Sequence, residues 1–316
     1  MVATTIPTMP PYKNVLLIGA GGSLGAPVLA AFAARPEYNM TIVTRHDSSA
    51  IFPSGVPVVR ANYVSLNSLV SAFKGQDAIV SLIGGHALSS QNFFIDAAIR
   101  AGVKRFIPSE FGPNSRNEEF VKYNDVVLPV RAGIVDYLKY EEGQGEGKLS
   151  WKSVICGGFF DWMLYSGMLG FDLKSRSVEL IDNGTSVCTF TSLSTVGETV
   201  VKILDHADET RNQYVFTMSF QVSPRDISEV IEKVDGKKWS VHYTTCEEVI
   251  AKGRKRLDNG DFAGIMDLTR GAAFGRLALG DESKNGFWNQ RLELVEDEDI
   301  EEAVRDVLRG QGMLSE

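Results

Sequence analysis

The chain has 316 residues, of which 44% are hydrophobic and 23% charged, and this length is enough for one large domain or two smaller ones. Such a composition is that of an ordinary globular protein and excludes a disordered or collagen-like chain. The formal net charge of −8 offers no uniform positive field, which argues against DNA or RNA as the main partner.

The first 160 residues alternate short apolar runs with helical patterns. Strands are predicted at residues 15–18, 40–44, 56–61, 78–83, 104–108 and 150–155. Helices are predicted at residues 24–34, 66–73, 91–101 and 130–140, and Gly75 and Gly102 stand where two of them need left-handed caps. This order predicts an α/β fold, a doubly wound parallel sheet of the Rossmann type.

The second half has a mixed pattern. Strands are expected at residues 178–181 and 214–218, and helices at 199–206 and 224–234. The sequence therefore predicts two domains, a Rossmann domain at 1–160 whose sheet later strands complete, and a smaller α+β substrate domain at 161–316. The glycine-rich stretch 143–148 is expected to be a surface loop, and residues 293–302, with seven acidic positions, a solvated terminal helix.

The charge is divided unevenly between the two halves. Residues 1–158 hold 14 basic and 12 acidic side chains, whereas residues 159–316 hold 18 and 28. The first half is therefore able to accept an anionic ligand, although the whole chain is acidic.

Cysteines and the N-terminal segment indicate the compartment. Cys156, Cys188 and Cys246 are far apart, which argues against a disulfide framework or a metal site. Residues 1–13 contain three prolines and no apolar stretch, and no window of the chain is apolar enough to span a membrane. We expect a cytoplasmic protein with no membrane partner and no bound metal.

A glycine-rich turn joins the first predicted strand to the first helix. It reads GAGGSLG, and its glycines fit the spacing GxxGxxG at Gly19, Gly22 and Gly25. Gly19 allows the tight turn, Gly22 lets phosphate oxygens approach the backbone, and Gly25 lets the helix pack closely. In this context the turn, with Ser23 and Leu24, predicts a dinucleotide pyrophosphate at the helix N-terminus.

The end of the second predicted strand indicates which dinucleotide is bound. Arg45 lies twenty residues after Gly25, where NAD enzymes carry an acid for the ribose 2′-hydroxyl. An arginine there favours the 2′-phosphate of NADP, and His46 and Ser48 supply further hydrogen bonds. Asp47 is the one neighbouring residue that supports NAD instead.

A second glycine pair follows the fourth predicted strand. Gly84 and Gly85 lie at the carboxyl edge of the expected sheet, where a bulky side chain would collide with the adenosine and ribose. We therefore add both glycines to the cofactor site and interpret His86 as a polar residue of its rim.

The segment after the fifth predicted strand carries a family resemblance. Residues 103–112 read VKRFIPSEFG, and residues 158–162 read GFFDW. With the glycine turn and Arg45, this pattern resembles the isoflavone-reductase-like and NmrA-like branch of atypical short-chain dehydrogenases over residues 13 to about 250. The resemblance implies NADP(H) as cofactor and reduction of phenylpropanoid, isoflavonoid, lignan or fungal polyketide-type aromatic compounds.

The catalytic residues follow only from this resemblance. The family's reductases have a lysine near the nicotinamide on the helix after the SEFG segment, and here that position is Arg131. Because arginine stays protonated, Arg131 can stabilise an oxyanion or anchor an acidic substrate but cannot act as a general base. Ser109 is a second catalytic candidate. By resemblance Phe159 flanks the nicotinamide, and Phe160, Trp162 and Met163 form an apolar substrate wall.

We therefore expect an oxidoreductase of secondary metabolism, an NADPH-dependent reductase of an aromatic or conjugated small molecule. Two alternatives stay open at this point. One is a non-catalytic NmrA-like regulator that senses NADP and reports to a protein partner, which Arg131 in place of lysine favours. The other is a family scaffold recruited to non-redox chemistry. Each is compatible with a monomer or a homodimer.

Overall fold

The chain forms two compact units that alternate along the sequence. The computed structural model describes residues 12–144, 149–295 and 298–314. Of the described residues, 12–109, 134–144, 149–153 and 197–214 belong to unit 1, and 110–133, 154–196, 215–295 and 298–314 belong to unit 2. The chain thus crosses between the units several times instead of once near residue 160, because later segments return to complete unit 1.

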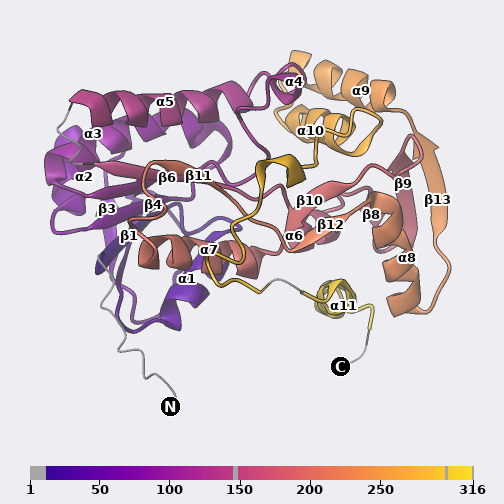
Figure 1. The fold of residues 1–316 in the computed structure, drawn as a ribbon, viewed down its shortest axis with the longest axis horizontal. Coiled ribbons are helices and arrows are strands. Elements are labelled where there is room, and N and C mark those ends of the chain that lie inside the picture. Colours follow the sequence, from indigo (N-terminus) through magenta and orange to yellow (C-terminus); the bar gives the residue numbers. More distant parts are fainter. Residues whose placement is uncertain (1–11, 145–148, 296–297, 315–316) are drawn as a thin grey trace. The chain divides into compact units, whose positions relative to one another are not determined.

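Unit 1 is built on a seven-stranded sheet with the order β11-β6-β5-β4-β1-β2-β3 (Figure 1). Its strands are β1 (Asn14–Ile18), β2 (Asn39–Arg45), β3 (Val58–Ala61), β4 (Ala78–Ser81), β5 (Arg105–Ile107), β6 (Ser150–Ile155) and β11 (Gln213–Phe216), the last two ending in unit 2. The pairs from β6 to β3 are parallel, and Val15 of β1 lies opposite Met40 of β2. These findings confirm the Rossmann-type sheet and its completion by a later strand.

Helices lie on both faces of this sheet (Figure 1). They are α2 (Leu66–Phe73), α3 (Gln91–Ala101) and α5 (Leu128–Gln144) on one face, and α1 (Gly25–Ala33) and α7 (Leu193–Asp205) on the other. On the first face Phe73, Phe94 and Leu138 pack with Phe106 and Trp151 of the strands into one buried core. Such burial of both faces is why the strands read as continuous apolar runs.

Predicted helix ends in unit 1 agree with the structure where a glycine marks them. Gly102 closes α3 with φ +78°, and Gly75 follows α2 with φ +77°. In contrast, α7 begins six residues before its predicted start. Its first turn is polar, and the Ser192 hydroxyl accepts the N–H of Thr195, so residues that resemble a loop are a capped helix start.

Unit 2 contains two small three-stranded sheets, ordered β12-β10-β7 and β13-β9-β8. Their strands are β7 (Gly158–Phe159), β8 (Phe171–Asp172), β9 (Ser177–Ile181), β10 (Cys188–Thr191), β12 (Phe220–Val222) and β13 (Ser240–Thr244). The remaining helices are η1 (Gly85–Ser90) in unit 1 and α4 (Glu118–Val121), α6 (Phe160–Tyr165), α8 (Pro224–Asp235), α9 (Cys246–Asp258), α10 (Gly264–Phe274), η2 (Ser283–Asn285) and α11 (Ile300–Gly310) in unit 2. The predicted α+β character of this part is confirmed, and its two sheets are smaller than that of unit 1.

The C-terminal helix differs from its prediction. Its bounds are Ile300–Gly310 rather than 293–302, and it is not a fully solvated helix. The Asp299 carboxylate caps it by accepting the N–H of Glu301 at 2.8 Å, so most of the acidic run precedes the helix. Val304 and Leu308, four residues apart, are fully buried in the core of unit 2. Residues 145–148, within the predicted glycine-rich loop, lie outside the described residues.

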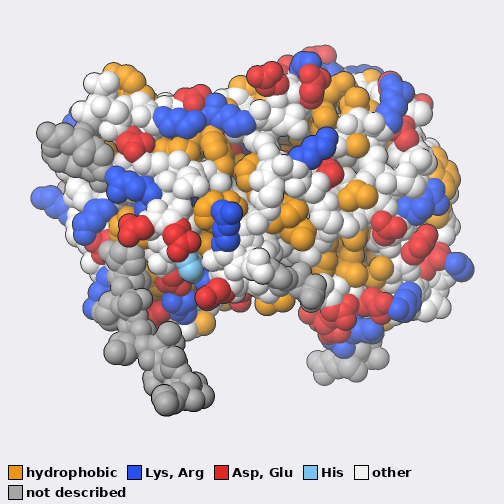
Figure 2. Space-filling view, viewed as in Figure 1, with side chains coloured by type: hydrophobic (Ala, Val, Ile, Leu, Met, Phe, Trp, Pro, Cys, Tyr) orange, Lys and Arg blue, Asp and Glu red, His pale blue; other side chains and the backbone are white. Residues whose placement is uncertain are grey.

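Surface and composition features of the described residues limit the classes of site. Cys156, Cys188 and Cys246 are free and buried. Within the described ranges, no group of three or more His, Cys, Asp or Glu is arranged to hold a metal ion, and no helix is long and apolar enough to cross a membrane. On the face shown in Figure 2, basic side chains are interspersed with acidic ones, in keeping with the net charge of −8.

Candidate functional site

The glycine turn of unit 1 connects β1 to α1 and is sterically closed to larger residues at two positions. Gly19 has φ +83°, and a Cβ on it would lie 2.9 Å from the backbone of Leu82 and Ile83. A Cβ on Gly25 would lie only 1.7 Å from the carbonyl oxygen of Ala20. These two glycines therefore fix the shape of the turn, as the sequence predicts.

The middle of the turn is open where the ends are closed. A Cβ on Gly22 would meet only the carbonyl of Gly19, at 3.4 Å. Ser23 is exposed, whereas Leu24 is buried and stands at the N-cap of α1 without a side-chain hydrogen bond to the helix. The first turn of α1 also holds no acidic residue. The N–H of Gly25 donates to the Gly22 carbonyl at 2.9 Å, and Pro27 has no N–H, so Ser23, Leu24 and Ala26 offer the N–H groups that fit the pyrophosphate of a dinucleotide.

The end of β2 presents a basic side chain to solvent. The Arg45 side chain is 64% exposed, and its Nε lies 3.7 Å from the Asp47 carboxylate, which is itself 77% exposed. An exposed ion pair at that distance contributes little and leaves the guanidinium available to a ligand. His46 is also exposed, and Ser48 is half-buried. The residue types fit a phosphate monoester, and the roles of Arg45 and His46 in cofactor binding stay predictions.

The glycine pair after β4 opens the short helix η1. Gly84 and Gly85 are exposed, and a Cβ on either would meet nothing within 4 Å among the described residues. Gly85 has φ +58°, a conformation that side chains rarely adopt. The protein itself therefore leaves the space above Gly84 clear, as a site for a bound adenosine and ribose requires.

Ser109 follows β5 and is almost completely buried in unit 1. Its hydroxyl donates to the carbonyl of Ile83 at 2.5 Å, and its N–H donates to Oε1 of Gln91 at 2.8 Å. The hydroxyl hydrogen of Ser109 is thus already donated to a backbone carbonyl in the segment after β4. A catalytic role for Ser109 stays a prediction, and its observed contacts position the loop after β5.

Arg131 lies in the first turns of α5, in the part of that helix that belongs to unit 2. Its Nη1 lies 2.5 Å from the point where a Cβ on Gly112 would stand, so the guanidinium occupies space that only a glycine leaves free. Its Nε is buried and has no hydrogen-bond partner among the described residues. Burial lowers the pKa of Arg131, while nearby Glu110 and Cys156 act in the opposite direction. Arg131 as a whole is half-buried, so the structure holds a partly desolvated cation near the buried carboxylate of Glu110.

Sequence reasoning missed a buried acid in the same unit. Glu282 is 2% exposed, its Oε1 accepts the N–H of Asn114 at 2.9 Å, and its Oε2 accepts Nδ2 of Asn285 at 2.9 Å. Burial raises the pKa of Glu282 to about 7, with a further contribution from Asp281. The Cys156 thiol is influenced by both Arg131 and Glu282, which places the three groups in one electrostatic neighbourhood. No sequence signal distinguishes Glu282 from the other acids of this half.

The predicted aromatic wall divides into half-buried and core residues. Phe159 in β7 and Trp162 in α6 are half-buried. Phe160 is fully buried, with its ring 4.7 Å from that of Phe220, and Met163 is 4% exposed. The structure therefore places Phe160 and Met163 in the core of unit 2. Substrate contacts of these residues, and the nicotinamide contact of Phe159, stay predictions.

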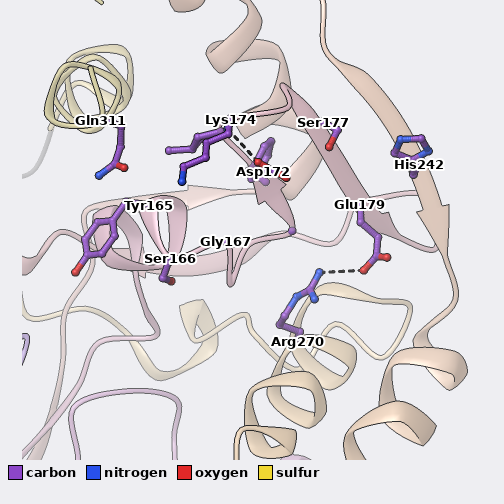
Figure 3. Close-up of a pocket in the computed structure, with 13 residues that line it drawn as sticks. Tyr165, Ser166, Gly167, Asp172, Lys174, Ser177, Glu179, His242, Arg270 and Gln311 are labelled. Atoms are coloured by element: carbon purple, nitrogen blue, oxygen red, sulfur yellow. Dashed lines mark hydrogen bonds and ion pairs between the residues drawn. The ribbon is translucent and has the colours of Figure 1, made fainter. Parts of the chain in front are cut away.

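Unit 2 also has an open pocket of about 550 Å³, which Tyr165, at the end of α6 and of the predicted aromatic wall, lines, whereas Phe160, Trp162 and Met163 do not (Figure 3). Arg270 of α10 points from its base toward Glu179 of β9, with 3.5 Å between Nη2 and Oε1. At the rim the N–H of Lys174 donates to the Asp172 carboxylate at 3.0 Å. Because these polar groups are paired with one another, the pocket indicates no ligand class.

Comparisons with known proteins agree with this geometry. A model of the NmrA-like family matches residues 11–144. The oxidoreductase poxI of Penicillium oxalicum is 33% identical over 79% of this chain and 78% of its own length. The oxidoreductase aprR of Aspergillus flavus is also 33% identical, over 81% of this chain and 86% of its own. A solved structure, AtPrR2 with NADP+ and (+)pinoresinol, shares the fold with a TM-score of 0.77 and 18% identity, covering 94% of this chain and 99% of that chain.

Proposed function

The chain belongs to the NmrA-like family, and from this premise we propose that it is an NADPH-dependent reductase of an aromatic or conjugated small molecule. The observation that carries the proposal is the glycine turn, in which Gly22 leaves the uncapped N-terminus of α1 open to an anion. Support also comes from the relatives, because poxI and aprR are named oxidoreductases and AtPrR2 has NADP+ and a lignan in its solved structure.

The residues of unit 1 then have distinct roles in holding the cofactor. The N–H groups at the start of α1 bind the pyrophosphate, and the exposed guanidinium of Arg45 binds the 2′-phosphate. Gly84 and Gly85 keep the space beside the adenosine ribose clear. NADPH, when bound, supplies a hydride from C4 of its nicotinamide ring.

Arg131 has the role of an electrostatic stabiliser in this proposal. Its guanidinium remains protonated, so it stabilises negative charge that develops on the acceptor oxygen but takes no proton. The proton that completes the reduction comes from water or from another acid. A cation desolvated by burial acts more strongly on a developing charge than one in water does.

A second candidate function is a sensor that binds NADP(H) without turning it over, and the absence of the family's lysine favours it. Both functions share the cofactor site, so only turnover separates them. A third candidate is a family scaffold that performs non-redox chemistry, and the contacts of the described residues give it no specific support.

The test is the consumption of NADPH by the purified protein against a panel of phenolic enones and quinones. We expect turnover with at least one member of the panel, and loss of that turnover in Gly22→Val, whose side chain fills the phosphate approach. NADPH bound at micromolar concentration together with complete inactivity across the panel would overturn the reductase and favour the sensor.

A further inference from the structure

A second arginine braces the loop that carries Arg45. Arg60 lies on β3, and its Nη1 lies within hydrogen-bond distance of three carbonyl oxygens of the neighbouring loop. The distances are 3.2 Å to Arg45, 2.9 Å to His46 and 3.1 Å to Ser48. All three carbonyl dipoles converge on this one charged nitrogen, which holds the loop toward β3.

The same loop is held from its other end by the glycine turn. The N–H of Ser48 donates to the Arg45 carbonyl at 3.2 Å, and the N–H of Ala50 donates to the Ser48 hydroxyl at 3.3 Å. The Cβ of Ala50 lies 3.0 Å from where a Cβ on Gly21 would stand. The loop is therefore held by Arg60 and by its own hydrogen bonds, and Ala50 at its end lies close to the glycine turn.

The charges of this region are complementary to a phosphate monoester. Arg45 and Arg60 provide two guanidinium groups, against the single carboxylate of Asp47. Nε and Nη2 of Arg60 make no hydrogen bond to any residue in the described ranges, so part of its donor capacity remains. Carbonyl oxygens turned toward a dianion would repel it, and here three of them are neutralised by Arg60.

We propose that Arg60 is a positioning residue for dinucleotide specificity, which orients the 45–48 loop so that Arg45 and the Ser48 hydroxyl meet a ribose 2′-phosphate. This inference rests on the proposed function, because it assumes that unit 1 binds NADP(H). It goes beyond that proposal by assigning the preference for the 2′-phosphate to a residue of β3 that the glycine and Arg45 pattern does not include.

The test uses ligands that contain only the adenosine end of the cofactor, so it does not depend on turnover. Isothermal titration with adenosine 2′,5′-bisphosphate and with 5′-AMP reports the contribution of the 2′-phosphate directly. We expect Arg60→Ala to weaken the bisphosphate about tenfold or more and 5′-AMP less than about twofold, because a displaced loop would no longer bring Arg45 to the 2′-phosphate. Arg100→Ala, at an exposed arginine in the last turn of α3, is the matched control and should change neither.

Arg60→Lys separates bracing from simple charge. A lysine keeps the positive charge, but its ammonium nitrogen ends one atom closer to the backbone than Nη1 of arginine, so it does not reach the same three carbonyls and we expect it to recover only a small part of the lost affinity. Full recovery by lysine, or an unchanged affinity in Arg60→Ala, would overturn the positioning role while leaving the proposed function intact. A wild-type protein that binds neither NADPH nor the bisphosphate would overturn both.

Discussion

Two arginines assigned to function lie in opposite environments. In unit 1 the Arg45 side chain is 64% exposed and has only a distant carboxylate nearby. In unit 2 Arg131 has a buried Nε without a partner among the described residues, and it lies against Gly112 beside Glu110. The first guanidinium is complementary to an outside ligand, whereas the second is part of an internal arrangement. The difference shows that an exposed charge at a strand end can be predicted from local sequence, whereas the surroundings of a partly buried charge depend on residues distant in the chain.

The buried ionisable groups of the two units extend this comparison. Unit 1 contains Lys152, which is fully buried in β6 and whose Nζ has no partner among the described residues. Unit 2 contains Glu282, whose carboxylate has two hydrogen-bond donors. Burial lowers the pKa of a base and raises the pKa of an acid. The contributions of Lys152 and Glu282 to folding stability should therefore change in opposite directions as the pH rises.

The largest expected effect is on turnover, from Arg131. We expect Arg131→Met to lower kcat about 100-fold while the dissociation constant of NADPH changes little, because the lost group stabilises charge only during the reaction. Steady-state kinetics with the best substrate of the panel, together with NADPH titration, measure both. Arg276→Met, at an exposed arginine of unit 2, is the control.

Two further variants sharpen the assignment of Arg131. Arg131→Lys should also lower turnover if the guanidinium fork is what the site uses, and a rise would show instead that arginine blocks lysine chemistry. Gly112→Ala places a methyl group 2.5 Å from Nη1 at a residue with φ +151°, so it should displace the guanidinium and reduce turnover in the same way. Full activity in Gly112→Ala would contradict the described contact.

The next effect is on stability, from Lys152. Burial lowers the pKa of Lys152 from its ordinary 10.5 to about 6, with nearby Arg105 acting in the same direction. The unfolded chain therefore binds one proton more than the folded one between these values, so stability rises with pH there, by at most about 1.4 kcal/mol per unit. Lys152→Met should raise the free energy of unfolding at pH 7 by about 2 kcal/mol and remove this slope.

Urea denaturation across pH 6 to 9 measures this prediction, with Lys74→Met, at an exposed lysine, as the control. A destabilised Lys152→Met with an unchanged slope would mean that Lys152 is charged and satisfied in the folded protein.

The smallest effect comes from Glu282 and has the opposite sign. Its folded pKa of about 7 exceeds the ordinary 4.5, so the folded chain binds more protons in this window and stability falls as pH rises through it. Glu282→Gln should flatten the stability profile between pH 4.5 and 7, by about 1 kcal/mol per pH unit. Glu119→Gln, at an exposed glutamate, should leave the slope as it is, and an equal slope in Glu282→Gln would refute the assignment.

Local patterns were sufficient to predict most of unit 1. The helices at 66–73 and 91–101 and the strand at 150–155 have their predicted bounds, because apolar periodicity and the cap glycine Gly102 are encoded in adjacent residues. Unit 2 was predicted only in outline. Its strands β7 and β8 have only two residues each, too few for a period to be visible, and β7 forms by pairing with the distant strand β10. Local sequence does not indicate which distant strand such a short segment pairs with.

The same limit applies to the candidate site. Gly19, Gly22 and Gly25 were predicted because a turn and a helix start are local events, and the structure gives them the steric roles expected. The contact of Arg131 with Gly112 joins residues of α5 and of the loop after β5, so no spacing rule reveals it. Glu282 was missed because its burial depends on Asn114, which lies 168 residues away.

The central claim is that unit 1 binds NADP(H) and that Arg45 recognises its 2′-phosphate. The most direct test is the affinity of the wild-type protein and of Arg45→Glu for NADPH and NADH. The account predicts that the wild type binds NADPH at least about tenfold more tightly than NADH, and that Arg45→Glu weakens NADPH far more than NADH. Equal losses for the two dinucleotides, or a wild type that prefers NADH, would contradict it.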